Sequence, residues 1–220
     1  MSMHGTDLKL RTAYASLALQ TITGILTALA FVVLPSDENG GTDLQTIAAL
    51  ELSSQILEFM WYAYVVFVYK QIITWTRYLD WFFSTPLMLV STALFFLHRQ
   101  SLPSSELLRG EGLGCLVCNA FMLFCGYIVE ADIVPHRSRL QTVAMGSVFF
   151  VGSFTFLATF IDEDDAISIV LFWIIYVVWA GYGLAALLPD TPKNVSYNIL
   201  DLVSKNMYGI FIFAYSASRS

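Results

Sequence analysis

The sequence predicts an all-α membrane protein in which a single domain, residues 1–220, forms a bundle of seven transmembrane helices. The first observation is the composition: 57% of the 220 residues are hydrophobic, only 13% are charged, and the mean hydropathy is +0.66. A soluble domain carries about twice this share of charge. The second observation is that the apolar residues form seven runs, each near the roughly 20 residues that a helix needs to cross a bilayer.

Each run is expected to be a helix, because hydrocarbon offers no partner to a free backbone N–H or C=O group. The runs, in chain order, are residues 13–35, 44–69, 74–97, 113–131, 140–161, 166–188 and 195–217. The links between them hold most of the Pro, Gly and charge, as in SDENGGTD (36–43), HRQSLPSSELLRGEG (98–112) and LPDTPKN (188–194). The N-terminal MSMHGTDLKLR is expected to be a polar lead-in rather than a signal peptide.

Several function classes are disfavoured by the same composition. The net charge of −6 and the scarcity of basic residues argue against a nucleic-acid partner. Cys115 and Cys118 form a CxxC pattern, but with Cys125 they lie inside an apolar run, where small packing residues are expected rather than a metal or redox site. The three histidines lie near run ends and form no metal-ligand pattern. We expect neither a metal site nor an enzyme.

Ionisable residues occur at membrane depth in the second, third and seventh runs. Each costs about 2.5 kcal/mol or more in a bilayer, so each is a candidate for function. The second run contains Glu51 and Glu58, the third contains Arg77 and Asp80, and the seventh contains Asp201 and Lys205.

Two interpretations of Lys205 are open from its own helix. It lies four residues after Asp201, on one face of an α-helix, so the two could be a structural ion pair. Alternatively, a desolvated lysine amine can form a Schiff base with an aldehyde. Asp80 and Asp201 favour the second interpretation, because a protonated Schiff base is a buried cation that needs anionic partners; Arg77 would balance the excess negative charge.

Aromatic and small residues around these charges suggest a slot for a long, apolar polyene. Trp81 follows Asp80 directly, Trp179 and Tyr182 are three residues apart, and Met122 and Gly126 are four apart. Singly, each residue is as well explained by packing. Together, around a central lysine, they predict a ligand pocket.

The motifs that contain these residues resemble those of the microbial rhodopsins. RYLDWFFSTPLMLV resembles their third helix, and LDLVSKN resembles their seventh. WAGYGLA resembles their sixth helix, although Gly183 stands where the family usually has proline. With the seven spans, the resemblance covers essentially the whole chain.

The resemblance implies all-trans retinal, bound covalently to Lys205 as a protonated Schiff base. Asp80 and Asp201 would be its counterions, with Asp80 also the proton acceptor and Arg77 beside them. The implied retinal-binding residues are Lys205, Trp81, Thr85, Met88, Met122, Gly126, Trp179 and Tyr182. On the fifth helix, spacing suggests Gly146 and Phe150.

The family contains pumps, channels and sensors, so the site has to discriminate between them. Proton pumps that resemble this chain usually have a carboxylate proton donor eleven residues after the acceptor. At the corresponding position, eleven residues after Asp80, this chain has Ser91. A sensor is not expected, because it would need a transducer-binding surface and we expect no extra segment to supply one. An outward proton pump stays open as the alternative, with Glu51 replacing the missing donor.

A light-gated cation channel, conducting Na⁺ and K⁺, is the favoured function. The second run has one polar helical face through three turns, formed by Glu51, Ser54, Gln55, Glu58 and Tyr62. Glutamates spaced by seven and an asparagine after the lysine resemble channelrhodopsins, and the short chain most resembles rhodopsins of large algal and protist viruses. That resemblance implies a central constriction of Glu58, Asn206 and a first-helix residue. Ser16 is the first choice, with Thr21 and Thr23 as rivals, and Ser54 and Tyr62 extend the path.

The expected partners are the lipid bilayer and monovalent cations or protons, and a homo-oligomer is compatible with this class. The orientation rests on conflicting signals. The family implies an extracellular N-terminus, which would place six basic residues outside (Lys9, Arg11, Lys70, Arg137, Arg139 and Lys193) and three inside (Arg99, Arg109 and Arg219). The positive-inside rule favours the reverse. We expect the family orientation.

Overall fold

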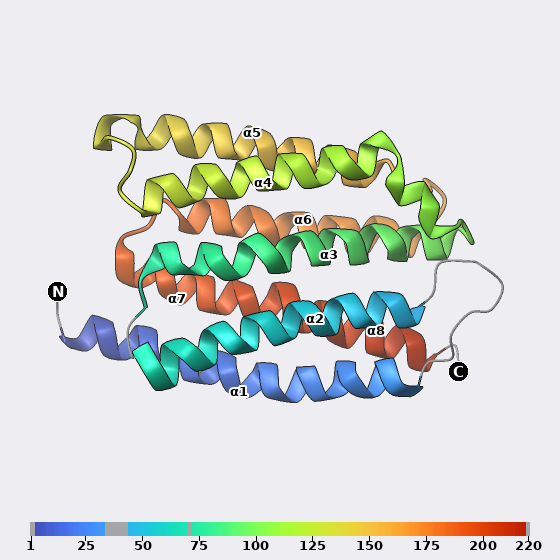
Figure 1. Cartoon of the computed structure of the whole chain (residues 1–220), viewed down its shortest axis with the longest axis horizontal. Coiled ribbons are helices and arrows are strands. Elements are labelled where there is room, and N and C mark those ends of the chain that lie inside the picture. The colour runs from blue at the N-terminus through green and yellow to red at the C-terminus, as the bar shows by residue number, and fades with distance from the viewer. Residues whose placement is uncertain (1–2, 34–43, 70–71, 219–220) are drawn as a thin grey trace.

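A computed structural model describes residues 3–33, 44–69 and 72–218. The helices are α1 (Met3–Val33), α2 (Leu44–Ala63), α3 (Arg77–Arg99), α4 (Gly110–Glu130), α5 (Arg139–Ala158), α6 (Ala166–Ala185), α7 (Asp190–Asp201) and α8 (Met207–Ala217). The π-helical turn η5 (Leu202–Asn206) joins α7 to α8, so these three elements form one rod. The described residues therefore form seven rods and no strand, which confirms the predicted all-α bundle (Figure 1).

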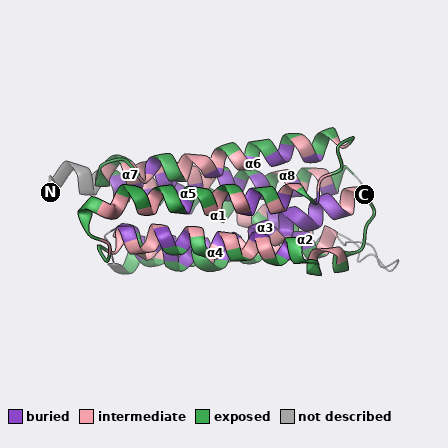
Figure 2. Cartoon of the chain, turned by 90° about the horizontal axis from the view of Figure 1, so that it is seen from above, coloured by how far each residue is buried: buried purple, intermediate pink, exposed green. Residues whose placement is uncertain are grey.

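The rods run side by side along the long axis of the molecule (Figure 1). α4 and α5 form one side, α1 forms the opposite side, and α3 and α6 lie between them. We name the two ends of the bundle by the chain terminus that Figure 1 places there. Buried residues gather on α3, whereas the outward faces of α4, α5 and α6 are exposed (Figure 2). α3 therefore forms the centre of the bundle.

The start of the first rod differs most from the expectation. α1 begins at Met3 rather than at residue 13. Its first turns are tied to α7, because Lys9 pairs with Asp190 and Thr12 accepts a hydrogen bond of 2.6 Å from Asn198. The second rod ends in a π-helical turn, η1 (Tyr64–Tyr69). The expected link at 36–43, and Lys70 and Arg219, lie outside the described residues.

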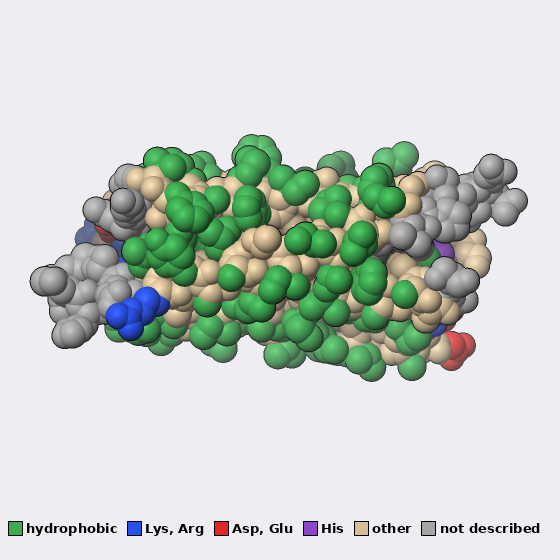
Figure 3. Space-filling view, turned by 90° about the horizontal axis from the view of Figure 1, so that it is seen from below, with side chains coloured by type: hydrophobic (Ala, Val, Ile, Leu, Met, Phe, Trp, Pro, Cys, Tyr) green, Lys and Arg blue, Asp and Glu red, His purple; other side chains and the backbone are tan. Residues whose placement is uncertain are grey.

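The outer surface suits a lipid environment. In the view of Figure 3, hydrophobic side chains cover the length of the molecule, and charged side chains lie at its ends. Five helices in the described part are long and apolar enough to cross a membrane. α2 and the α7–η5–α8 rod are not among them, because α2 contains an inward polar face and η5 divides the last rod. The ionisable residues at membrane depth are thus buried inside the bundle, as expected for a multi-pass membrane protein: Glu51, Glu58, Arg77, Asp80, Asp201 and Lys205.

A bidentate ion pair closes the C-terminal end of the bundle. Arg99, at the end of α3, donates hydrogen bonds of 2.8 and 2.6 Å to the two carboxylate oxygens of Asp165. Asp165 also accepts hydrogen bonds from Ser168 and from the backbone of Ile167, so it caps α6. The Arg99 guanidinium holds the pKa of Asp165 well below its usual range. The pair therefore fixes the start of α6 against the end of α3.

Asp165→Asn is expected to lower the free energy of unfolding by about 2 kcal/mol at neutral pH, because it removes charge-assisted hydrogen bonds. A carboxylate with a depressed pKa stabilises the fold fully above its unfolded pKa of about 3.9, and that contribution is lost as the pH falls below it. Thermal melting of wild type and variant should therefore converge at acidic pH. The exposed neighbour Asp164 supplies a control, Asp164→Asn, which should melt like wild type. Equal melting of D165N and D164N at neutral pH would contradict this role.

Candidate functional site

Lys205 lies at the centre of the bundle against carboxylates from two other rods. Its Nζ donates a hydrogen bond of 2.8 Å to Asp80 Oδ2 on α3 and lies 3.6 Å from Glu58 Oε1 on α2. All three side chains are at most 2% exposed. Sequence reasoning anticipated Asp80 beside the lysine but placed Glu58 only in an ion path. The structure brings both carboxylates to the amine.

Asp201 is engaged by other groups. It forms an ion pair of 3.0 Å with Arg77 and accepts hydrogen bonds from Tyr62 at 2.7 Å and Tyr182 at 2.8 Å. Among the described residues, the ion pairs of Lys205 are with Asp80 and Glu58, not with Asp201. Arg77, which was expected to balance the excess negative charge of the two aspartates, pairs directly with Asp201 rather than with Asp80.

The π-helical geometry of η5 explains this separation. In a regular α-helix, residues four apart share a face. A π-helical turn closes after five residues and re-aims the side chains that it contains. Lys205 lies within η5 and Asp201 directly precedes it, so the two side chains turn to different partners. The sequence spacing alone could not reveal this turn.

Arg77 anchors a polar network toward the N-terminal end. Besides Asp201, it donates to Asn194 Oδ1 at 3.3 Å and to Asn198, and its guanidinium lies 4.7 Å from the ring centroid of Trp61. Sequence reasoning missed both asparagines. They precede Asp201 at helical spacing, on the polar face of α7, and that periodicity could have identified them.

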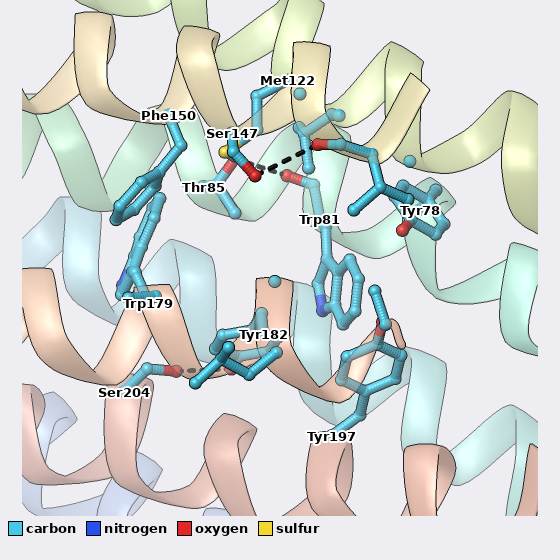
Figure 4. A pocket seen from close by; sticks show the side chains of 18 of the residues that line it. Tyr78, Trp81, Thr85, Met122, Ser147, Phe150, Trp179, Tyr182, Tyr197 and Ser204 are labelled. Atoms are coloured by element: carbon cyan, nitrogen blue, oxygen red, sulfur yellow. Dashed lines mark hydrogen bonds between the residues drawn. The ribbon is translucent and has the colours of Figure 1, made fainter. Parts of the chain in front are cut away.

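A cavity of about 410 Å³ extends from Lys205 between α3, α4, α5, α6 and the last rod. Trp81 and Trp179, from α3 and α6, point into it with Tyr182 and Phe150 (Figure 4). All eight residues named for retinal line it, and so do Gly146 and Phe150. The lining residues that sequence reasoning did not name include Tyr78, Leu123, Ser147, Tyr197 and Ser204.

Three tyrosines and Gly126 determine the shape of one side of this cavity; the tyrosines are Tyr78, Tyr182 and Tyr197. The Tyr197 ring packs edge-on against Trp81 at 5.0 Å and stacks on Tyr182 at 5.8 Å. A Cβ at Gly126 would lie 2.7 Å from the ring of Tyr78, which only a glycine avoids. Tyr78 belongs to the RYLDW motif, so the motif itself could have identified it.

Thr85 contacts the cavity and the interior of α4. The buried Asn119 donates a hydrogen bond of 2.9 Å to Thr85 Oγ1, which fixes the threonine against α4. Sequence reasoning did not single out Asn119, because a lone asparagine in the fourth run carries no spacing signal.

The cavity fits a retinal bound through an amine. Its volume lies within the range of about 300–1,000 Å³ that is usual for ligand pockets. Its lining is largely aromatic and aliphatic, and Lys205 supplies a primary amine at its wall. An apolar chain along the aromatic and aliphatic lining and an aldehyde carbon at the amine match these features.

The polar face of α2 is buried inside the bundle. Its residues Glu51, Ser54, Gln55, Glu58 and Tyr62 are each at most 2% exposed. Along α2, the face leads from Tyr62 at the Arg77 network, through Glu58 beside the amine, to Glu51 near the C-terminal end. Ser54 Oγ lies 3.5 Å from the backbone oxygen of Ser84 on α3. The predicted path residues of α2 thus form one continuous stripe.

The first-helix residue at Asn206 is Thr23 rather than Ser16. Thr23 donates a hydrogen bond to Asn206 Oδ1, whereas Ser16 donates to the backbone oxygen of Asn198 at 3.2 Å. Thr21 bonds back to its own helix at Leu17. Ser16 lies seven residues before Thr23, about 10 Å along the helix axis, and so at the level of Asn198. The preference for Ser16 over its rival Thr23 at this contact is therefore corrected.

Known proteins share sequence and fold with this chain. A family model described as "Bacteriorhodopsin-like protein" matches residues 11–219. Bacteriorhodopsin-I from two strains of Haloquadratum walsbyi is 29% identical over 154 residues, which are 63% of this chain and 57% of the relative. The alignment therefore spans little more than half the length of those relatives.

Solved structures share the fold over nearly the whole chain. The viral rhodopsin OLPVRII superposes with a TM-score of 0.83 at 27% identity, covering 97% of this chain and 100% of that one. A light-driven proton pump from Leptosphaeria maculans (TM-score 0.78, 10% identity, 96% and 97% covered) and the rhodopsin of Exiguobacterium sibiricum (0.75, 14%, 96% and 96%) show the fold alone. Because the family model spans almost every residue, the chain belongs to the bacteriorhodopsin-like family, the microbial rhodopsins, whose members carry a lysine-bound retinal and serve light-driven ion transport or photoreception.

Proposed function

We propose that the protein is a light-gated channel for monovalent cations, Na⁺ and K⁺, with all-trans retinal held covalently on Lys205. Retinal, when bound, absorbs visible light and changes shape by isomerisation. The support is the cavity that ends at the amine and the polar stripe of α2, which meets the same amine through Glu58.

In this proposal, Asp80 holds a proton on Lys205 Nζ in the dark and accepts that proton after illumination. The distance of 2.8 Å between Asp80 Oδ2 and Nζ suits both roles. Transfer neutralises both partners, so the attraction that ties η5 to α3 disappears. Arg77 and Asp201 stay paired, and they keep the N-terminal part of the last rod in place.

The observation that carries the channel function is a set of buried polar atoms without a hydrogen-bond partner among the described residues. Within the described residues, neither carboxylate oxygen of Glu51 or Glu58 forms a hydrogen bond, and neither amide atom of Gln55 does. The side-chain amide of Gln20 on α1 and the Asn206 amide nitrogen also lack a hydrogen-bond partner in the described part of the chain. Buried polar groups normally have partners. A stripe of buried groups without hydrogen bonds is suited to water and cations that enter when the helices move, and its carboxylates attract cations and repel anions.

One observation favours the alternative, an outward proton pump. Glu51 interacts electrostatically with Ser91 and Tyr208, whose hydroxyl groups lie 3.4 Å apart. Ser91 stands where related pumps have their proton donor, so Glu51 is placed to return a proton toward Lys205 from α2.

Glu58→Gln distinguishes the two functions, because it removes a charge with little change in shape. Under the channel function, the variant should still form pigment, and its conductance or selectivity among cations should change several-fold. Under the pump function, Glu51→Gln should instead slow proton return to Lys205 on the order of 10²-fold. Voltage clamp and flash photolysis measure these effects. The exposed Glu111 supplies a control, Glu111→Gln, which should behave as wild type. An unchanged current in E58Q together with a slow photocycle in E51Q would favour the pump.

We further propose an extracellular N-terminus, as the family implies, although the count of basic residues favours the reverse. An epitope tag at the N-terminus should then be accessible to antibody on intact cells. Labelling only after permeabilisation would show instead that the N-terminus lies inside the cell.

A further inference from the structure

Gln55 occupies a slot that exists because Gly209, on another helix, has no side chain. Its side chain is buried, and both amide atoms lack a hydrogen-bond partner among the described residues. A Cβ at Gly24 on α1 would lie 3.8 Å from Gln55 Oε1, which is ordinary contact. A Cβ at Gly209 on α8 would collide with Gln55 Nε2 and lie 3.3 Å from its Cδ. The amide therefore rests directly on the backbone of α8.

The slot lies between the two carboxylates of the α2 stripe. Gln55 follows Glu51 by four residues and precedes Glu58 by three, so all three share one helix face. Thr27 of α1 bounds the slot as well, because its Oγ1 would be 3.0 Å from a Cβ at Gly209. The amide thus fills the space among α1, α2 and α8 at the level between Glu58 and Glu51.

Gly209 is also connected mechanically to the lysine. It follows Lys205 by four residues, one turn along the same rod, so a displacement of η5 moves Gly209 with it. Asn206, between them, is hydrogen-bonded to Thr23 on α1. The rod therefore contacts α1 through Asn206 and α2 through the Gly209–Gln55 contact.

We infer that Gln55, seated against Gly209, closes the ion path on the C-terminal side of Lys205, and that their contact transmits movement of the lysine-bearing rod to α2. This inference rests on the proposed channel function. When the rod shifts after illumination, Gly209 leaves the amide, and Gln55 can turn toward water and passing cations. When the rod returns, the amide re-enters the slot and the path closes.

The test uses steric complementation between the two positions. Gln55→Ala should empty the slot, and Gly209→Ala should expel the amide from it. Each single variant should raise the dark current and slow channel closing on the order of tenfold, which corresponds to about 1.4 kcal/mol. In the double variant Q55A/G209A, the new methyl group occupies part of the vacated space, so closing should return toward the wild-type rate.

Two further variants serve as controls. Gly24→Ala places its methyl group at ordinary contact distance and should leave the currents unchanged. Gln55→Met fills the slot without an amide and should keep the dark state closed. All variants should form pigment with a wild-type absorption maximum, which shows that they fold and keep the retinal cavity.

The outcomes separate this inference from the function on which it rests. Dark currents and closing rates are recorded in cells whose reversal potential is also measured. Wild-type current that reverses with the cation gradient supports the channel. If the effects of Q55A and G209A are then absent, or simply add in the double variant, the role of the Gln55–Gly209 contact in closing the path is overturned while the channel function stands. If wild-type current does not reverse, the channel function and the closing role of Gln55 are both overturned.

Discussion

Lys205→Ala is expected to abolish visible absorption of protein supplied with all-trans retinal. The amine of Lys205 lies at the wall of the cavity, and alanine leaves no nucleophile there for the aldehyde. Absorption spectra of purified wild type and variant, loaded identically, measure the effect. Lys193, which forms an ion pair of 2.6 Å with Glu130 toward the N-terminal end, supplies the control Lys193→Ala, expected to retain colour.

Borohydride reduction of the Schiff base tests the same assignment, because it makes the bond between retinal and its lysine permanent. Reduction should fix retinal on the peptide that contains Lys205 in wild type, as a mass increase found by mass spectrometry. A covalent visible pigment in K205A, or the mass increase on a different lysine peptide, would contradict the assignment of the cavity.

Asp80→Asn is expected to shift the absorption of the pigment to longer wavelength and to slow loss of the Nζ proton on the order of 10²-fold. Asp80 is the nearer of the two carboxylates that face the amine, 2.8 Å against 3.6 Å for Glu58. Removing its charge destabilises the cationic ground state, which lowers the excitation energy, and it also removes the proton acceptor. Static spectra and flash photolysis measure the two effects.

Glu58→Gln is the matched control for that experiment, because Glu58 faces the same Nζ from α2. Its spectral shift should be smaller than that of D80N, and proton loss should stay close to the wild-type rate. If D80N instead keeps the wild-type spectrum and proton loss, then Glu58 or Asp201 is the main counterion.

Much of the fold was predictable from sequence, since the length and hydropathy of each run determine whether it can cross a bilayer. The seven rods agree with the seven runs. The early start of α1 was not predictable, because it depends on contacts of Lys9 and Thr12 with α7, far away in the chain. The π-helical turns were also not predictable, because no residue spacing distinguishes them from a regular helix.

In the candidate site, too, some features were predictable from sequence and others depend on how the rods pack. Lys205, Asp80 and the aromatic cavity residues lie in motifs that resemble those of the microbial rhodopsins, and that resemblance implied a common site for them. The pairing of Arg77 with Asp201, and the approach of Glu58 to the amine, depend on how the rods are rotated about their own axes. The same holds for Thr23, which displaced Ser16 at Asn206: both face inward on α1, and only its axial register against the last rod decides between them.

The central claim, a light-gated cation path through the bundle, is tested most directly by the reversal potential of the wild-type photocurrent. Cells expressing the protein are held at several voltages under illumination, while external Na⁺ is exchanged for a large organic cation. For a channel, we expect a current that reverses sign near the cation equilibrium potential, with a reversal potential that moves to more negative voltage after the exchange. A photocurrent that keeps one sign at every voltage and ignores the exchange would contradict the channel and identify a pump.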